Sequence, residues 1–383
     1  MSGYTYLDHA ATTPMRPEAV AAMLPHLSEQ YANPSGSHRF AREARKAIDD
    51  AREVVAEVIG CKPGEVIFTG GGTEADNTAI LGTLARRGGT AVCPAAEHHA
   101  VLESVHRARG EVVATTATGA VDLEDLARVL ALNTAVSVVS VMSVNNEVGT
   151  VNDMAAVAQV VRRHAPVAAL HTDAVQAACW LDLRGITPHV DLLALSAHKF
   201  GGPKGVGVLV AREGTAFEPM LIGGGQERER RSGTHNVAGI VAMAEALRIT
   251  DAQRHEELPR IAALRDRLVD RLLAELPGVH ETVAREQKVA GSAHLGIEGI
   301  ENEALLFLLD EAGVCASAAS ACAAGAMEPS HVLAAMGVPR ALAQGAVRLT
   351  LGFASTAADV DRGADVLVSA VHQLRRTNAR QSA

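Results

Sequence analysis

Lys199 is the residue whose position most directly suggests chemistry. It follows an apolar run in LLALSAHKFGGPKG (residues 192–205), with Ser196 and His198 before it and two glycines after it. A lysine at the end of a strand usually extends into water and does nothing else. An amine held in a partly dry pocket, however, has a lowered pKa and can form a Schiff base with an aldehyde. The pattern therefore makes Lys199 a candidate for covalent catalysis.

Polar side chains also follow other apolar runs. HTDAVQ places Asp173 and Gln176 after one run, VNNEVG places Asn146 after a second, and AEHHAV places His98 after a third. Each residue has a structural alternative, because an aspartate often caps a helix, an asparagine often forms an Asx turn, and a lone histidine is often structural. Ligands of open α/β sheets bind beyond the carboxyl ends of the strands, and these residues concentrate there.

A glycine run precedes an expected helix in FTGGGTEADN, with Thr73 at the start of the helix. Glycines let backbone amides approach a ligand closely, and a helix N-terminus favours an anion, so the segment could hold a phosphate. It matches neither GxGxxG nor GxxxxGK[ST], so neither a dinucleotide nor ATP is indicated. A tight turn between strand and helix explains this segment equally well when it is taken alone.

Pyridoxal phosphate would use all of these groups. Its aldehyde needs a lysine, its ring nitrogen needs an acidic partner, and its phosphate needs a helix N-terminus with hydroxyl groups. If each of these residues had only a structural role, their common position at one edge of one sheet would require several coincidences.

The elements that must position these residues alternate along the chain between about 60 and 215. Short runs rich in Val, Ile, Leu and Ala alternate with helical patterns, which predicts an α/β fold whose mostly parallel sheet has helices on both faces. The expected strands are 65–70, 90–95, 111–116, 135–144, 166–173, 191–198 and 205–211.

The remaining chain has a different pattern. Residues 235–275 form a long helical pattern that Pro259 should interrupt, and strands mixed with helices follow. We expect residues 31–255 to form a large cofactor-binding domain and residues 256–383 a smaller α+β domain. Residues 1–30 are expected to pack with the smaller domain.

Composition excludes several classes of protein. The chain has 383 residues, a formal net charge of −9 and 3% aromatic residues, so it lacks the basic patches and stacking rings of a nucleic-acid surface. The run VSVVSVMSV is too short to cross a membrane. No basic region followed by an apolar stretch is visible at the N-terminus, so we expect a cytoplasmic protein.

The five cysteines do not indicate a disulfide framework. Their number is odd and no CxxC pair occurs, so we expect neither structural disulfides nor a metal site. Four lie among aliphatic residues. The fifth, Cys322, lies in ASAASACAAGAMEPSH, a stretch whose small residues offer little packing. Composition alone favours a small buried thiol at this position.

Several motifs in order resemble the cysteine desulfurases of the NifS/IscS type, in the class V aminotransferase group of fold-type I pyridoxal-phosphate enzymes. The resemblance runs over nearly the whole chain. It rests on YLDHAATTP, GGGTEADN, NNEVGT, HTDAVQ, SAHKFGGPKGVG, GGGQERERRSGT and RLTLG.

The resemblance implies a role for each ring-binding residue. Lys199 is similar to the lysine that joins the cofactor, and Asp173 to the partner of the ring nitrogen. Gln176 resembles the donor to the ring hydroxyl. His98 resembles the imidazole that stacks on the ring and moves protons.

The resemblance also implies ligands for the cofactor phosphate. Thr73, Ser196 and His198 resemble the side-chain ligands, and Gly72 contributes its backbone. Thr234 is similar to the residue that reaches the phosphate from the other subunit of a homodimer.

Three residues resemble the substrate contacts of this family. Arg348 is similar to the bidentate clamp for the substrate carboxylate, since a guanidinium matches two oxygens. Asn146 resembles a contact to that carboxylate or to the ring hydroxyl, and Asn33 lies in the similar substrate-channel segment YANPSGSH.

For Cys322 the resemblance reverses the preference from composition. The segment of about 316–328 is similar to the family's catalytic loop, whose cysteine takes sulfur from L-cysteine as a persulfide and leaves L-alanine. The implied partner is a sulfur-acceptor protein, either a scaffold for iron–sulfur cluster assembly or a thiolation enzyme. A selenocysteine lyase or a related pyridoxal-phosphate-dependent C–S lyase of the same group is the alternative.

The chain departs from the family pattern at Phe353. Many members have an arginine after the LG of this strand, where this chain reads LGF. We therefore expect one positive charge near the substrate to be missing. The CAAGAM segment is also richer in alanine than usual, which favours helix.

Overall fold

A seven-stranded sheet forms the centre of the larger part of the protein. The computed structural model describes residues 3–318 and 330–381. Only β8 runs antiparallel to its neighbours, so the prediction of a mostly parallel sheet is confirmed. The strand order is β2 (Val66–Thr69), β8 (Gly207–Ala211), β7 (Leu192–Ser196), β6 (Ala169–Asp173), β5 (Val136–Ser140), β3 (Thr90–Pro94) and β4 (Glu111–Val113).

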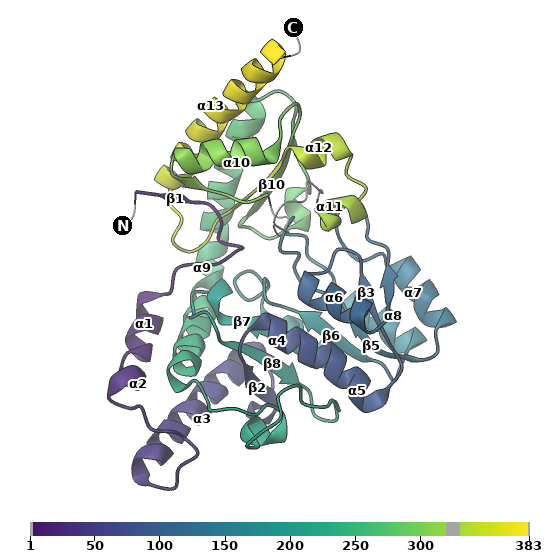
Figure 1. Ribbon diagram of the computed structural model, residues 1–383, viewed down its shortest axis with the longest axis vertical. Helices are drawn as coiled ribbons and strands as arrows, with labels where there is room; N and C mark the ends of the chain where they lie inside the picture. Colours follow the sequence, from purple (N-terminus) through teal and green to yellow (C-terminus); the bar gives the residue numbers. More distant parts are fainter. Residues whose placement is uncertain (1–2, 319–329, 382–383) are drawn as a thin grey trace.

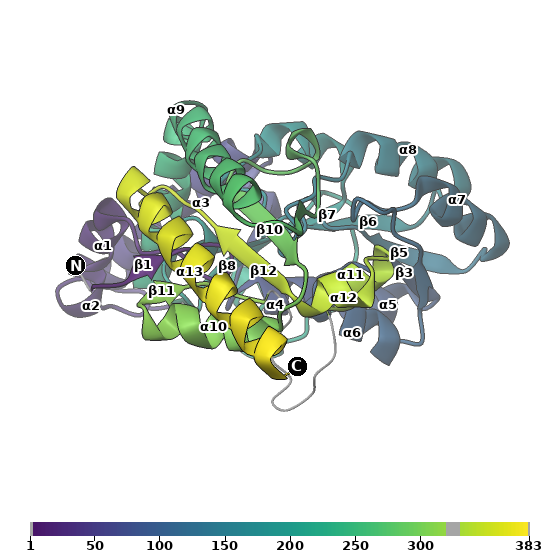
Figure 2. The same ribbon diagram turned by 90° about the horizontal axis from the view of Figure 1, so that it is seen from above.

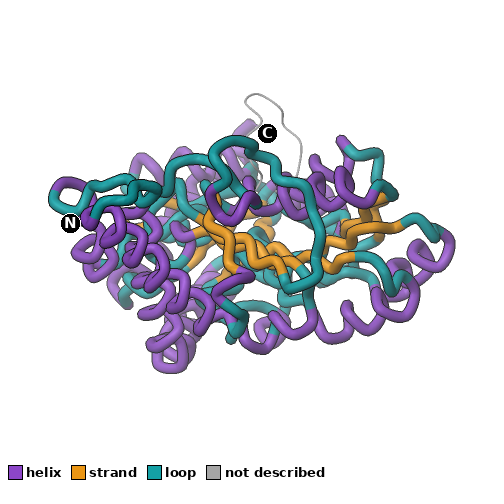
Figure 3. The backbone as a smooth tube through the Cα atoms, turned by 90° about the horizontal axis from the view of Figure 1, so that it is seen from below, coloured by secondary structure: helices purple, strands orange, loops and turns teal. Residues whose placement is uncertain are grey.

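Helices cover both faces of this sheet, as Figure 3 shows with the strands in orange between helices. Along β7, Leu193 and Leu195 enter one core and Leu192 and Ala194 enter the other, because successive side chains of a strand point to opposite faces. One face is covered by α3 (Arg39–Ile59), α7 (Leu123–Leu132) and α8 (Met154–His164). The other is covered by α4 (Gly72–Asn77), α5 (Thr83–Arg87) and α6 (His99–Arg107).

The smaller part is built on an antiparallel sheet. Its order is β12 (Ala346–Thr350), β10 (Ser292–Ile297) and β9 (Val279–Glu281). Helices α10 (Asn302–Glu311) and α13 (Ala357–Gln381) lie side by side next to it (Figure 2). The short strand β1 (Thr5–Tyr6) pairs in parallel with β11 (Val314–Cys315). Helices α11 (His331–Ala335) and α12 (Arg340–Gln344) face the larger part.

Helix α9 (Val237–Glu275) joins the two parts without a break (Figure 1). The expected interruption at Pro259 was wrong, because the helix continues through this residue. Its side chains from Val237 to Leu247 belong to the large core, and those from Ile261 to Leu272 belong to the small core. The boundary that we expect near residue 255 therefore falls inside a helix.

The first thirty residues divide between the two cores. Leu7 packs in the small core. Ala19, on α1 (Pro17–Met23), packs in the large core, and α1 and α2 (Pro25–Ser28) lie against α9. In the described part of the chain, no helix combines the length and apolar character needed to span a membrane.

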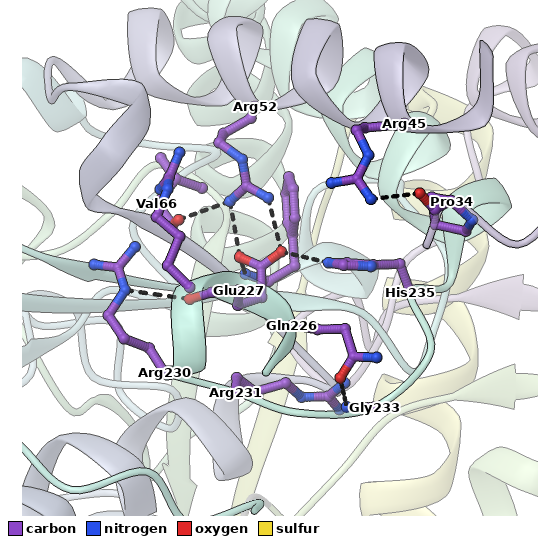
Figure 4. A network of polar contacts seen from close by, with 12 residues as sticks. Pro34, Arg45, Arg52, Val66, Gln226, Glu227, Arg230, Arg231, Gly233 and His235 are labelled. Atoms are coloured by element: carbon purple, nitrogen blue, oxygen red, sulfur yellow. Dashed lines mark hydrogen bonds and ion pairs between the residues drawn. The ribbon is translucent and has the colours of Figure 1, made fainter. Parts of the chain in front are cut away.

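A buried ion pair anchors the loop 223–236, which follows β8 (Figure 4). Glu227 accepts hydrogen bonds from both terminal nitrogens of Arg52 at 2.8 and 2.7 Å, and from His235 Nε2 at 2.8 Å. Burial alone would raise the pKa of Glu227, but the hydrogen bonds from His235 and Arg52 lower it to about 2. The carboxylate is therefore ionised at neutral pH and ties the loop to α3.

The same loop contains three successive non-glycine residues with left-handed backbone. The φ angles of Glu227, Arg228 and Glu229 are 50°, 58° and 66°. The left-handed conformation costs an L-residue about 1–2 kcal/mol, because Cβ lies too close to the following carbonyl oxygen.

Glu229 is exposed, so its replacement tests this cost directly. We expect Glu229→Gly to raise the free energy of unfolding by about 0.5–1 kcal/mol, after the entropy cost of glycine is subtracted. Denaturant unfolding measures the change. Glu229→Ala keeps Cβ and should match the parent protein, and equal stability of the glycine and alanine variants would contradict the strain.

Candidate active site

The site lies where parallel strands of the large sheet end. Asp173 is the last residue of β6 and Ser196 is the last residue of β7. Asn146 follows β5, and His98 follows β3. Because parallel strands end at the same edge of a sheet, the chain positions these four side chains together.

Lys199 ends a short 3₁₀ turn after β7. Its Nζ donates hydrogen bonds to the carbonyl oxygens of Ala10 at 2.6 Å and Ala11 at 2.9 Å. Gln176 Nε2 also donates to the Ala10 oxygen, at 2.8 Å. Burial and the charge of Arg348 lower the pKa of Lys199 to about 8, against the opposing charge of Asp173. A useful fraction of the amine is therefore neutral, and nucleophilic, near neutral pH.

Asp173 is a buried carboxylate beside this amine. Its Oδ1 accepts a hydrogen bond from the backbone N–H of Val175 at 2.8 Å. Burial raises the pKa of Asp173, while the charges of His98 and Lys199 oppose that shift. One ligand-type atom from each of Asp173, His98 and Asp76 lies within 4.8 Å of the others. The carboxylate of Asp173 could pair with a protonated ring nitrogen.

His98 is exposed and caps α6. Its Nδ1 accepts from the backbone N–H of Ala100 at 3.1 Å, which leaves Nε2 to carry the proton of the neutral ring. Desolvation lowers the pKa of His98, and the charge of Asp173 opposes this shift. Thr73 and His98 both line a shallow hollow at the surface of the site.

The glycine run forms a close-fitting cradle. A Cβ at Gly72 would lie 2.7 Å from Val175 Cγ2 and 3.5 Å from Ser196 Cβ, so only glycine fits there. Thr73 is exposed beside it, and Ser196 is buried. His198 Nδ1 lies 3.2 Å from Thr12 Oγ1, and burial lowers its pKa to about 4. Backbone amides, hydroxyl groups and a neutral imidazole are suitable phosphate ligands.

Arg348 comes from β12 of the small sheet. Its Nη1 donates to the carbonyl oxygen of Asn146 at 2.8 Å, and its Nη2 donates to Asp8 Oδ1 at 2.7 Å. Its Nε is buried and has no hydrogen-bond partner. The structure thus brings Arg348 and Asn146 together, and these two hydrogen bonds use two of the five guanidinium N–H groups.

Asn33 and Thr234 are exposed and lie apart from this group. Asn33 Oδ1 accepts from the backbone N–H of Ser35 at 2.9 Å, in the loop between α2 and α3. Thr234 lies in the loop that Glu227 anchors. Within the described residues of one chain, no hydrogen bond connects either residue to Lys199 or Arg348.

Cys322 lies outside the described residues, and the described chain resumes at residue 330, where side-chain contacts anchor it. Ser330 caps α11 and donates to a carboxylate oxygen of Glu147. His331 Nε2 lies 2.9 Å from the carbonyl oxygen of Glu97, and its ring lies 4.5 Å from the ring of His99. Burial raises the pKa of Glu147 to about 7. Residues 330–331 are thus tied to the loops that carry His98 and Asn146.

Phe353 lies in an apolar cavity between the two parts of the protein. The cavity is also lined by Lys199, Gln176, Arg16 and Cys179. The Arg16 guanidinium lies 4.2 Å from the centre of the Phe353 ring. Although Phe353 itself carries no charge, the cavity therefore has a buried cation in contact with this ring.

Sequence reasoning missed several contacts of the site. It did not identify the Ala10 and Ala11 carbonyls that hold Lys199, the Asp8 partner of Arg348, or the buried residues Asp76 and His171. All five residues lie in YLDHAATTP, HTDAVQ or GGGTEADN, so the motifs contained the signal. The long-range pairing of those motifs could not be obtained from local pattern.

The residues fit pyridoxal phosphate. Lys199 offers an amine with a lowered pKa, Asp173 a buried carboxylate, and Gly72 a cradle that a Cβ would fill. The site combines an electrophile-binding amine, an acidic partner for a ring nitrogen and an anion-binding turn, which are the groups this cofactor requires.

Comparison with known proteins agrees with this chemistry. Residues 5–362 match the family model of class-V aminotransferases. The chain is 44% identical to an IscS-like cysteine desulfurase of Mycobacterium tuberculosis, over 97% of each chain. It is 39% identical to the cysteine desulfurase IscS of Dictyoglomus turgidum, over 98% of this chain and 96% of the relative.

A solved structure of a NifS-like protein is 32% identical and superposes with a TM-score of 0.90, covering 97% of this chain and 100% of the other. Fold, site chemistry and these similarities agree. The chain belongs to the class-V aminotransferase family, and within it is a pyridoxal-phosphate-dependent cysteine desulfurase.

Proposed function

We propose that this cysteine desulfurase transfers the sulfur of L-cysteine to Cys322 as a persulfide, with Lys199 as the cofactor-bearing lysine. The observation that carries the proposal is the Lys199 amine, which has a lowered pKa and lies within the electrostatic reach of buried Asp173. When bound, pyridoxal phosphate supplies an aldehyde and an electron-accepting ring.

The other residues of the site hold the cofactor in this proposal. Asp173 keeps a proton on the ring nitrogen, and Gln176 donates to the ring hydroxyl. His98 stacks on the ring. Gly72, Thr73, Ser196 and His198 bind the phosphate.

Arg348 and Lys199 act on the substrate. The free Nε–H of Arg348 donates to the substrate carboxylate, beside Asn146. Lys199, once displaced from the cofactor, is the base for the α-proton. The Cys322 thiolate then forms a bond to the substrate sulfur while the carbon–sulfur bond breaks. The carbon retains the electron pair and takes a proton, so alanine leaves.

We further propose a homodimer in which Thr234 and Asn33 complete the site of the other subunit. Support comes from the exposed apolar side chains of Met220, Leu221 and Ile222, directly before the loop that carries Thr234. Ile222 is 89% exposed, which is unusual for a large apolar residue.

The recipient of the sulfur in this proposal is an acceptor protein, either a scaffold or a thiolation enzyme. The compartment is the cytoplasm, where the four described cysteines would stay as the free thiols that they are in the structure.

Lys199→Ala tests the covalent role of the amine. We expect the absorbance of the lysine-bound cofactor to disappear and turnover to fall about 10²–10⁴-fold, because the base for the α-proton is lost. Absorbance spectra and alanine release measure both effects. Lys204→Ala, an exposed lysine nearby, is the control and should change neither. An unchanged spectrum in Lys199→Ala would refute the assignment.

Cys322→Ser tests the sulfur-accepting thiol. The variant should lose persulfide and alanine formation but retain the yellow bound cofactor, because serine is a poor nucleophile toward sulfur. Labelled cysteine followed by mass spectrometry measures the persulfide. Cys61→Ser serves as the matched control and should behave as the parent enzyme. Parental turnover in Cys322→Ser would exclude the proposed role.

Ile222→Asp tests the dimer. A charge at the proposed interface should shift the molecular mass in sedimentation from two chains to one and weaken cofactor retention, since Thr234 would no longer reach the other site. Phe307→Asp, on α10 and 65% exposed, alters an apolar surface elsewhere and should leave the mass unchanged. A parent protein that sediments as one chain would contradict the proposal.

A further inference from the structure

Asp76 is a buried acid that the reaction does not use. It lies on α4, one turn after Gly72, and is 1% exposed. No cation contributes to its electrostatic environment, whereas burial and the charges of Asp173 and Glu97 all raise its pKa. A carboxylate in this position would be an unpaired buried charge, which proteins avoid by neutralising the group.

Two buried polar atoms without partners face each other at this position. Asp76 Oδ1 lies 3.6 Å from His171 Nε2, and neither atom has a hydrogen-bond partner. The distance slightly exceeds that of a hydrogen bond. If one of the two atoms carries a proton, a small movement of either side chain would therefore form a hydrogen bond. Two facing acceptors would otherwise both remain unsatisfied, at a free-energy cost for each.

The second nitrogen of His171 has a hydrogen-bond partner of its own. His171 Nδ1 lies 2.8 Å from Ser140 Oγ, on the neighbouring strand β5. Burial lowers the pKa of His171 to about 3, so the ring is neutral. A protonated Asp76 fits this arrangement, because it can donate to Nε2 while the Nδ1–H of the same neutral tautomer donates to the Ser140 hydroxyl.

The surrounding titratable groups also favour a neutral Asp76 beside an ionised Asp173. Asp173 shares β6 and its face with His171, two residues away, and has the positive charges of His98 and Lys199 nearby. Glu97, after β3, accepts from the backbone N–H of Met142 and adds a third buried acid. The charges of His98 and Lys199 oppose the raised pKa of Asp173, whereas no such charge opposes that of Asp76, so Asp173 ionises more readily than Asp76.

We propose that Asp76 is a positioning residue that stays protonated and donates to His171 Nε2, so that Asp173 is the single anion facing the cofactor ring nitrogen. The inference rests on the role proposed above for Asp173. It assigns Asp76 a hydrogen-bonding function rather than a charge, and no proton leaves the Asp76–His171–Ser140 chain during turnover.

Two variants of the holoenzyme, Asp76→Asn and Asp76→Leu, distinguish a protonated Asp76 from an ionised one. Asparagine retains a neutral donor, so the pH midpoint of the cofactor absorbance change should stay within about 0.3 pH units of the parent, well below the shift expected from a lost charge. If Asp76 were ionised, asparagine would remove a negative charge within 4.8 Å of Asp173 and lower the midpoint by about one unit or more. That larger shift would overturn the proposal.

Asp76→Leu removes the donor and leaves His171 Nε2 unpaired. We expect a Tm lower by about 2–4 °C than that of Asp76→Asn. Equal Tm values for the two variants would contradict the hydrogen bond to His171.

Infrared spectroscopy gives a readout that does not depend on activity. The holoenzyme at neutral pH should show the C=O stretch of a protonated carboxylic acid that disappears in Asp76→Asn. Glu97→Gln is the control, and the band of Asp76 should persist in it. If Asp76→Asn leaves every protonated-acid band in place, Asp76 is ionised and the proposal fails.

Asp173→Asn distinguishes this failure from a failure of the proposed function. It should lower the midpoint strongly, because it removes the anion beside the ring. If it leaves the midpoint unchanged, the role of Asp173 is wrong, whereas the infrared band and the Tm difference still report the protonation of Asp76 and its bond to His171.

Discussion

The hydrogen bonds from Lys199 to the carbonyl oxygens of Ala10 and Ala11 are the contacts on which the site depends. They connect the end of a strand in the large sheet to a segment that begins with β1 of the two-stranded sheet. That segment pairs through β1 with β11, and Asp8 binds Arg348. Thr13 then donates its backbone N–H to the carbonyl oxygen of His198 at 3.1 Å. The N-terminal residues therefore hold the Lys199 amine and the Arg348 guanidinium in one frame.

Burial decides how charge is distributed in this frame. Lys199 and Arg348 lie close enough for the arginine to lower the pKa of the lysine, and Asp173 and Asp8 oppose that effect. Each cation of the site thus has an acid nearby. No cation contributes to the pKa shift of Asp76 or Glu97, and both side chains are completely or almost completely buried. L-cysteine carries a carboxylate, which the ionised forms of these two acids would repel, so neutral acids at these positions favour its binding.

Local pattern was sufficient for most of the fold. Alternating apolar runs and helical periodicity predicted all seven strands of the large sheet, because parallel strands buried on both faces have a distinctive composition. Pro259 was misjudged, since the packing of α9 against both cores overrides the local penalty of a proline.

The site was predictable to the extent that its residues follow strands. Lys199, Asp173, Asn146 and His98 satisfy this condition. Asp8 and Asp76 do not, because their importance comes from partners at least ninety positions away in the chain. Asn33 and Thr234 cannot be placed in a site by one chain alone.

The unbroken helix α9 has a mechanical consequence. Because one continuous helix packs in both cores, a rotation of one half is passed on to the other. The two halves therefore cannot separate as they could if a flexible linker joined them. The helix is weakest at Pro259, because proline has no backbone N–H and one hydrogen bond of the helix is therefore missing. Any flexing of one half against the other concentrates at this position, below the cavity that Phe353 and Arg16 line.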